Sequence, residues 1–413
     1  DPEGSLLKSG GKLYGLASIG GNTGAGALFE YDPTSNNYAK LHDFSTATGR
    51  LPLGTLVQSG STFYGLTSTG GSSGNGVLFQ YSLSGGYTDR FHLHATSGSG
   101  PRAGLIESGG KYYGMTFAGG LNEGGVLFEF NPNTQQFHPL HAFEPATGIH
   151  PEENLIEVGG VFYGMAYEGG NYNAGVIFKY TPGSGYAAIH HFDQTLGAKP
   201  RGGLTAYNGK LYGMTYEGGN NSSGVIFEYD PSSNGYLVLH HFTSATGTGP
   251  LGSLTLLNNK LYGLTAFGGA NESGIVFEIT PNTPGSYLAR HHFVSATGAS
   301  PFGSLTADHG KLYGTTAFGG NGSGVIFELD PLSGVYTALY KFGSGGSFRS
   351  DLAFFNQKMY GTTHVGGSGR GNVYRYDPAT NGYSNLFSFT DPNGVYPFYG
   401  PLLAQAPALN PNR

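Results

Sequence analysis

Residues 111–120 read KYYGMTFAGG, and residues 125–130 follow with GVLFEF. The pair Tyr-Gly in this stretch occurs eight times along the chain, at intervals of 47 to 51 residues, from Tyr14 to Tyr360. A period near 50, sustained over 413 residues, predicts an array of one repeated unit. The repeats also provide an internal comparison. A residue that all copies share is expected to be structural, whereas a residue that departs in one or two copies needs another explanation.

Each repeat is predicted to contain four short strands. In the third copy these are residues 101–107, 111–117, 125–130 and 137–143, which Gly, Pro and Asn clusters separate. Eight units of four antiparallel strands predict an all-β fold, an eight-bladed β-propeller. We expect this single domain to span residues 1–404, with residues 405–413 as a C-terminal tail or linker.

Two details of the repeat bear on how the ring is built. The glycine of each Tyr-Gly pair lies in mid-strand, where glycine is unfavourable, so a neighbouring backbone or aromatic ring is expected to pack against it. The first-strand pattern occurs nine times, once more than eight blades need, and the surplus copy is at residues 400–403. We expect that copy to pair with the first repeat; the alternative is that it lies outside the ring.

Composition excludes several classes of protein. A net charge of -6 with only 20 Lys and Arg argues against a nucleic-acid-binding surface. There is no run of about 18 apolar residues, so no membrane span is expected. Cysteine is absent, which excludes disulfides, zinc-thiolate sites and thiol catalysis. No cofactor-binding fingerprint is present, and no cofactor is predicted. The abundance of Gly, Asn, Ser and Tyr favours a secreted protein, which we expect to be a monomer.

Doubled histidines occur near the end of three predicted fourth strands, at residues 190–191, 240–241 and 291–292. Imidazole is a common metal ligand, so such pairs suggest a metal site. Across the eight copies, however, the first of the two positions holds His, Phe or Tyr, as an aromatic packing position would. The second holds residues as different as Asp43, Ala142 and Lys341, which indicates an exposed face. We therefore predict packing and no metal.

The departures from the repeat that matter for function lie where the chain enters each first strand. The default there is proline, an apolar residue, glycine and a small residue, as in Pro52-Leu53-Gly54-Thr55. Blades three, four, five and eight depart from it, with Arg102, Glu152, Glu153, Asn154, Arg201, Arg349 and Asp351. His150 and Lys199 stand immediately before their prolines.

A second set of departures precedes the double glycine that ends each second strand. Tyr167-Glu168, Tyr216-Glu217 and His364 stand there in blades four, five and eight. In a four-stranded meander the loop after strand two emerges at the same end as the connection between blades. The two sets are therefore predicted to share one face, concentrated over blades three to five.

The repeat also resembles known families. A second strand that ends in Gly-Gly, within four strands per unit, resembles Kelch-type propellers in topology. This chain has no Trp, and Tyr38, Tyr87, Phe137 and Tyr186 occupy the place of the Kelch strand-four Trp. The unit LYGxTxxGG followed by GVxFEY is more similar to the bacterial tandem repeats called GloVer. That resemblance covers essentially the whole chain. It implies a propeller and an exported bacterial protein, secreted or on the cell surface, and brings no catalytic residues with it.

A single polar, aromatic-lined sector is typical of an active or single-ligand site. Our leading hypothesis is a polysaccharide lyase that acts on a uronate-containing glycan. Arg102 or Arg201 would neutralise the carboxylate, His150 would be the base, and Tyr167 or Tyr216 would be the acid. Lys199, Glu168, Glu217, Asn154, Arg349, Asp351 and His364 would contact the substrate.

Three alternatives stay open at this point. One is a glycoside hydrolase that uses a carboxylate pair among Glu152, Glu153, Glu168 and Glu217. Another is a noncatalytic glycan-binding or adhesion propeller. The third is a solvated rim with incidental ion pairs.

Overall fold

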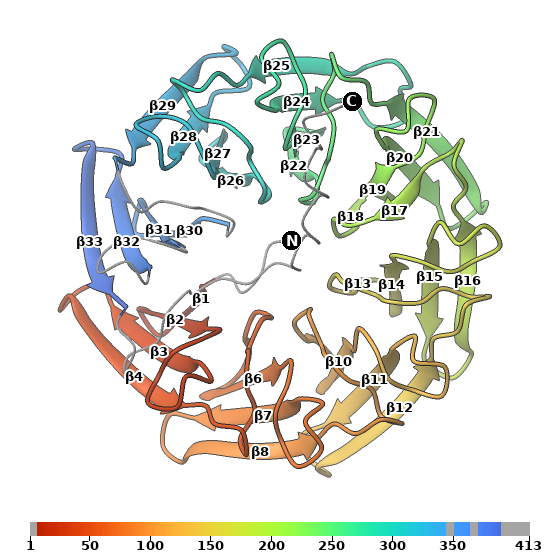
Figure 1. Cartoon of the computed structure of the whole chain (residues 1–413), viewed down its shortest axis with the longest axis vertical. Coiled ribbons are helices and arrows are strands. Elements are labelled where there is room, and N and C mark those ends of the chain that lie inside the picture. Colours follow the sequence, from red (N-terminus) through yellow and green to blue (C-terminus); the bar gives the residue numbers. More distant parts are fainter. Residues whose placement is uncertain (1–5, 344–350, 364–370, 390–413) are drawn as a thin grey trace, which may run out of the picture.

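The computed structural model describes residues 6–343, 351–363 and 371–389. Its strands form eight antiparallel sheets arranged as blades around a central axis (Figure 1). Apart from one extra short strand in blade five, the strands of each blade follow one another in sequence order, with the first strand nearest the axis and the last at the outer wall (Figure 1). The predicted eight-bladed propeller with four antiparallel strands per blade is confirmed.

The first half of the ring comprises blades one to four. Blade one contains β1 (Leu7–Ser9), β2 (Lys12–Ala17), β3 (Ala27–Asp32) and β4 (Asn37–Asp43), and blade two contains β5 (Val57–Ser59), β6 (Thr62–Thr67), β7 (Val77–Ser82) and β8 (Gly86–His92). Blade three contains β9 (Ile106–Ser108), β10 (Lys111–Met115), β11 (Val126–Asn131) and β12 (Gln136–Ala142), and blade four contains β13 (Ile156–Val158), β14 (Val161–Ala166), β15 (Val176–Thr181) and β16 (Gly185–His191).

The second half differs only by one extra short strand, β17, which pairs with the end of β19 in blade five. Blade five contains β17 (Ala198–Pro200), β18 (Thr205–Tyr207), β19 (Lys210–Glu217), β20 (Val225–Asp230) and β21 (Gly235–His241), and blade six contains β22 (Thr255–Leu257), β23 (Lys260–Thr265), β24 (Ile275–Ile279) and β25 (Leu288–His292). Blade seven contains β26 (Thr306–Asp308), β27 (Lys311–Thr316), β28 (Val325–Leu329) and β29 (Tyr336–Lys341), and blade eight contains β30 (Ala353–Phe355), β31 (Lys358–Thr363), β32 (Asn372–Asp377) and β33 (Gly382–Ser388).

The glycine of each Tyr-Gly pair makes room for an aromatic ring of the third strand. A Cβ on Gly164 would lie 2.5 Å from Cζ of Phe178, and the other blades repeat this arrangement. Blade eight has Tyr374 in place of the phenylalanine, against Gly361. Glycine is therefore required by close packing at these positions, as expected from its recurrence in mid-strand.

The hydrophobic core lies between neighbouring blades. Met165 of blade four and Phe227 of blade five, for example, belong to one buried cluster. Each blade thus buries its apolar face against the next, which is why a single repeat cannot form a core alone.

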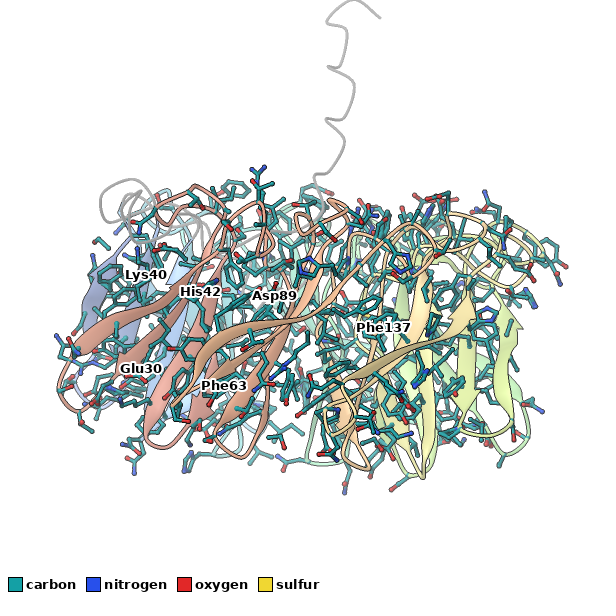
Figure 2. All side chains as sticks on the ribbon, turned by 90° about the horizontal axis from the view of Figure 1, so that it is seen from below. Glu30, Lys40, His42, Phe63, Asp89 and Phe137 are labelled. Carbon is teal, nitrogen blue, oxygen red and sulfur yellow. The ribbon has the colours of Figure 1, made fainter. Side chains whose placement is uncertain are left out.

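A ring of stacked aromatic side chains joins the outer strands of adjacent blades. His291 of blade six stacks on Tyr336 of blade seven, with ring centroids 3.6 Å apart and ring planes within 2°. The other seven junctions have equivalent stacks: His42–Tyr87, Phe91–Phe137, His141–Tyr186, His190–Tyr236, His240–Tyr287, Tyr340–Tyr383 and Phe387–Tyr38. The outer wall that carries His42 and Phe137 faces the viewer in Figure 2. The first histidine position is therefore an aromatic packing position, as predicted, and burial lowers the pKa of His291 to about 4.

The stack between Phe387 and Tyr38 joins the last blade to the first, with ring centroids 3.6 Å apart. All four strands of blade one come from one continuous stretch, β1 to β4. The ring is thus closed at its outer wall by side-chain stacking between β33 and β4. The surplus first-strand copy at residues 400–403 lies outside the described residues.

The second position of the doubled histidines, one residue after the stacked ring, forms hydrogen bonds with the loop that follows the second strand. Nδ1 of His191 accepts a hydrogen bond from the backbone N–H of Asn171, at 3.2 Å, and His92, His241 and His292 make the same contact. In blade one, Asp43 takes this role toward Asn22. Where the position holds histidine or aspartate, the interpretation as a plain exposed face was therefore wrong, because these five side chains are partly buried acceptors for loop N–H groups. Lys341 of blade seven is exposed, as predicted.

None of the described segments forms a helix with the length and hydrophobicity needed to cross a bilayer.

Candidate functional site

The two sets of sequence departures lie on the same face of the propeller. Ile149 and Glu168 form an antiparallel bridge, and Ala198 pairs with Glu217 in the same way one blade further on. The connection between blades therefore runs beside the loop after the second strand. We call this side of the ring the loop face, and the opposite side, formed by the tight turns between strands one and two and between strands three and four, the turn face.

Glu168 lies at the centre of a charged network on the loop face. Its carboxylate is 2.7 Å from Nζ of Lys199 and 3.2 Å from Nδ1 of His150. The hydrogen bond from Lys199 is the main reason why the pKa of Glu168 is lowered. Because an ionised carboxylate accepts from Nδ1–H, Nε2 of a neutral His150 carries the lone pair, as a general base requires.

Arg201 lies between two tyrosine rings. Its guanidinium carbon is 4.8 Å from the ring centroid of Tyr167 and 5.2 Å from that of Tyr216. One terminal nitrogen donates to the hydroxyl oxygen of Tyr167, at 3.2 Å. Nε is buried and has no hydrogen-bond partner among the described residues. A buried donor without a partner is costly unless a ligand or water satisfies it.

Arg102 and Glu152 form an ion pair at the edge of this sector. Nη1 of Arg102 is 2.6 Å from Oε1 of Glu152, which is only 8% exposed. The guanidinium lies 3.3 Å from the ring centroid of Phe117, and His150 stacks on the same ring at 4.6 Å. Oε2 of Glu152 is buried without a partner among the described residues. The sector therefore contains a buried acceptor on Glu152 and a buried donor on Arg201 that no described residue satisfies.

Three predicted site residues, Glu153, Asn154 and Asp351, lie deeper, in the central channel. Oδ1 of Asn154 accepts the backbone N–H of Gly104, at 2.7 Å, and Oδ1 of Asp351 accepts that of Ser304, at 2.8 Å. Ser253 and Ser304 make equivalent bonds between blades, so Asn154 and Asp351 belong to a series of contacts that joins the inner strands. A cavity of about 350 Å³ is lined by this series and by Glu153. Burial raises the pKa of Asp351 to about 6.

Three further predicted residues add less to the geometry. The backbone of Glu217 pairs with Ala198 on the loop face. Arg349 and His364 lie outside the described residues. Among the described residues, no three His, Asp or Glu side chains are grouped as they would be around a metal ion.

Sequence reasoning missed the aromatic residues that extend the site. The ring of Phe117 packs against both Arg102 and His150. Phe267 and Phe318 lie on the loop face of blades six and seven and are 39% and 52% exposed. Phe302 lies between the last two, with ring centroids 6.3 Å and 6.4 Å away. We call Phe267, Phe302 and Phe318 the aromatic shelf. The signal was present in the sequence, because one of the two positions before each double glycine is aromatic in blades three to seven.

Solved structures resemble the chain in fold. A puromycin-hydrolyzing peptidase of Mycobacterium tuberculosis matches with a TM-score of 0.52 and 9% identity, over 96% of this chain and 54% of that chain. A puromycin hydrolase complexed with PGG matches with a TM-score of 0.50 and 12% identity, over 91% of this chain and 58% of its own. At such identities the likeness shows a shared propeller fold only, and this chain spans about half the length of those proteins.

Sequence comparison gives the family. No curated protein matches the chain. The family model of the Gloeobacter/Verrucomicrobia repeat matches residues 1–175 and again residues 150–368. These two matches cover most of the ring, in keeping with the resemblance that the repeat motif carries. The chain therefore belongs to the Gloeobacter/Verrucomicrobia repeat family.

Proposed function

We propose that the protein is a polysaccharide lyase that cleaves a uronate-containing glycan on its loop face, over blades three to five. One observation carries the proposal: Glu168 holds His150 and Lys199 together, next to the Tyr167 hydroxyl that Arg201 contacts. A base, a phenolic acid and two cations thereby come into one small sector. These are the groups that β-elimination next to a carboxylate needs.

The proposed reaction assigns one role to each group. Arg201 pairs with the uronate carboxylate and stabilises the negative charge that develops when C5 loses its proton. Nε2 of His150 accepts that proton, and the electron pair of the C5–H bond forms the C4–C5 double bond. The bond between C4 and the glycosidic oxygen breaks, and the hydroxyl of Tyr167 or Tyr216 protonates the leaving oxygen. Proton exchange with solvent then restores His150 and the tyrosine.

The carboxylates of the sector favour elimination over hydrolysis. A glycoside hydrolase needs one protonated carboxyl as its general acid. The ammonium of Lys199 lowers the pKa of Glu168 and keeps it ionised, and Glu152 is ion-paired with Arg102. Glu153 lines the cavity inside the channel. Glu168 and Glu152 therefore suit orientation and ion pairing better than proton donation.

A noncatalytic glycan-binding propeller is the second candidate, and the aromatic shelf favours it. Its two exposed members, Phe267 and Phe318, can stack on the faces of sugar rings, and they need no chemistry beside them. Both candidates require the exported, bacterial location that the sequence led us to expect, since polysaccharides of this kind are met outside the cell. Both are compatible with a monomer.

Incubation with a panel of acidic and neutral polysaccharides separates the candidates. A lyase produces new chain ends together with the ultraviolet absorbance of the C4–C5 double bond. A hydrolase produces reducing ends without that absorbance. Retention on immobilised polysaccharide without any product indicates binding alone. If the protein forms no product and is not retained on any polysaccharide, a glycan function is contradicted.

A further inference from the structure

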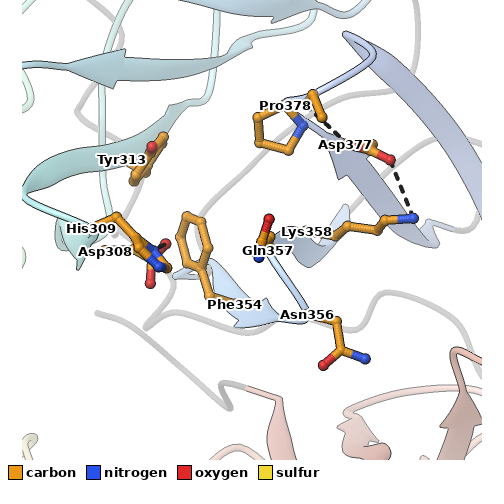
Figure 3. A pocket seen from close by; sticks show the side chains of 10 residues that line it. Asp308, His309, Tyr313, Phe354, Asn356, Gln357, Lys358, Asp377 and Pro378 are labelled. Atoms are coloured by element: carbon orange, nitrogen blue, oxygen red, sulfur yellow. Dashed lines mark hydrogen bonds and ion pairs between the residues drawn. The ribbon is translucent and has the colours of Figure 1, made fainter.

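A second cavity, of about 550 Å³, opens between blades seven and eight on the turn face (Figure 3). It is formed by the turn between β26 and β27, the turn between β30 and β31, and the turn after β32. First-to-second-strand turns lie at the end of a blade opposite to the second-to-third-strand loops. This cavity is therefore on the other side of the ring from the candidate active site.

Blade eight departs from the repeat at this cavity. Phe354 occupies a first-strand position that holds polar or aliphatic residues in the other copies: Lys8, Gln58, Glu107, Glu157, Ala206, Leu256 and Ala307. Its ring packs on Tyr313 of blade seven, with centroids 4.8 Å apart. An aromatic wall thus stands at this junction because of one residue that the repeat does not require.

A second departure of blade eight from the repeat gives a lysine a different partner, on the opposite wall of the cavity. In five other blades the lysine that opens the second strand pairs with a glutamate of the third, as Lys311 does with Glu328, at 2.6 Å. In blade eight Arg375 occupies that glutamate position, opposite Tyr360 in the strand register. Lys358 pairs instead with Asp377, at 3.2 Å, where both line the cavity. Two independent departures therefore shape the same space.

The walls of the cavity combine ring surfaces with hydrogen-bonding edges. Tyr313 and Phe354 lie on one side, and Pro378, Asp377 and Lys358 on the other (Figure 3). Asp308 lies beside the aromatic pair, with Nδ1 of His309 2.5 Å from its carboxylate. A pyranose has the complementary character, because its C–H faces pack on rings and its hydroxyls meet carboxylates, amides and ammonium groups at the edge.

We propose that this cavity binds a neutral pyranose unit. Asp308 and Asp377 accept from hydroxyls, and Lys358, the only lysine or arginine among the described lining residues, is already paired with Asp377, so no unpaired cation is left there to select an acidic sugar. The ligand class thus differs from that of the loop face, where arginine and lysine would select uronates. This proposal does not depend on catalysis at the loop face.

The test is calorimetric titration of the full chain with methyl glucoside, methyl galactoside, methyl mannoside and galacturonic acid. A neutral glycoside is expected to bind with a dissociation constant of about 1 mM, as a shallow site for one sugar ring would. Phe354→Leu, which introduces the residue that blade six holds as Leu256, should weaken binding at least tenfold while preserving the fold. Asp308→Asn should weaken it less.

Two controls make the result decisive. Leu256→Ala, at the equivalent position of blade six, should leave the affinity unchanged, and so should Arg201→Leu on the loop face. Binding that survives Phe354→Leu unchanged, a preference for galacturonic acid that Phe354→Leu abolishes, or no binding of any of the three glycosides would each overturn the proposal.

Discussion

The carboxylate of Glu168 lies 3.2 Å from Nδ1 of His150, although 18 residues separate them in the chain. The contact joins the connection that leads into blade four to the loop that follows its second strand. No other described blade places an acidic residue and a histidine at these two positions. The pair therefore distinguishes blade four within an otherwise regular ring, and it orients the imidazole that we assign as the base.

Replacing His150 by Asn should abolish most turnover and leave binding in place. His150 has a φ of 60°, and asparagine tolerates this left-handed conformation, so the loop should keep its shape. Loss of a general base is expected to slow turnover about a hundredfold or more. Initial rates and polysaccharide retention measure the two effects. Ser300→Asn, at the equivalent position of blade seven with a φ of 52°, is the matched control and should change neither.

Replacing Arg201 by Leu should weaken binding of an acidic oligosaccharide by about 1.5–3 kcal/mol, the range for hydrogen bonds to charged groups. Leucine is the residue that blades two and six hold at this position, as Leu53 and Leu251, so the fold should tolerate it. Titration calorimetry gives the affinity. Equal weakening toward a neutral oligosaccharide would show that Arg201 does not recognise the carboxylate.

Replacing Arg102 by Leu should lower the free energy of unfolding by about 1–3 kcal/mol, because the buried carboxylate of Glu152 loses its cation. The double variant Arg102→Leu with Glu152→Leu removes both charges and should recover much of that loss. Denaturant unfolding of the four proteins completes the cycle. Additive effects of the two substitutions would mean that the ion pair contributes no stability.

The stacked histidines predict a stability that falls in acid. Burial lowers the pKa of His42, His190, His240 and His291 to about 4, below the ordinary 6.5, and lowers that of His141. As the pH falls, the histidines of the unfolded chain therefore take up protons before those of the folded chain. The contribution of the neutral, buried histidines to the free energy of unfolding is complete above pH 6.5 and is lost as the pH falls from there toward 4. Melting temperatures across this interval report the loss.

His291→Phe should make the melting temperature less dependent on pH between 6.5 and 4. Phenylalanine fills the equivalent position naturally, as Phe91 and Phe387. His138→Gln, on the exposed face of β12, serves as the control and should leave the pH dependence as it is. A His291→Phe profile parallel to that of the unaltered chain would rule out this origin of acid sensitivity.

Removal of the aromatic shelf should affect long ligands more than short ones. Phe267→Ala and Phe318→Ala each delete a ring beyond the charged sector, at a cost of about 1 kcal/mol in affinity if a sugar stacks there. Affinity measured against oligosaccharides of increasing length should lose its length dependence in the double variant. Leu332→Ala, an 85% exposed residue elsewhere, controls for general surface effects. An equal loss for the shortest oligosaccharide would contradict a polymer path over the shelf.

The repeat made the fold predictable from sequence, since eight copies exposed every structural requirement repeatedly. The histidine series shows how this works: exchange of His291 with Phe91 and Tyr340 at the same position predicted packing, and the stacks confirm it. The glycine against Phe178 was expected for the same reason.

The site was harder to predict, because a departure from the repeat does not reveal its partner. Asn154 and Asp351 looked like ligand contacts, yet both accept backbone N–H groups of a neighbouring blade. Serine performs this function in blades six and seven, so a polar side chain there was an alternative structural solution. Phe267 was not predicted as a site residue, because the sequence alone does not distinguish it from the many phenylalanines that form the core of the repeat. Exposure, which only the three-dimensional structure gives, separates it from the core phenylalanines.

Elimination at a uronate is tested most directly by the ultraviolet absorbance that develops during incubation with uronate polysaccharides. The unaltered protein should produce a steady rise in the absorbance of the unsaturated uronate on at least one of them, with new chain ends in equal number. His150→Asn should bind the same polysaccharide with little or no rise. Chain ends without absorbance, or equal rates for both proteins, would contradict the account.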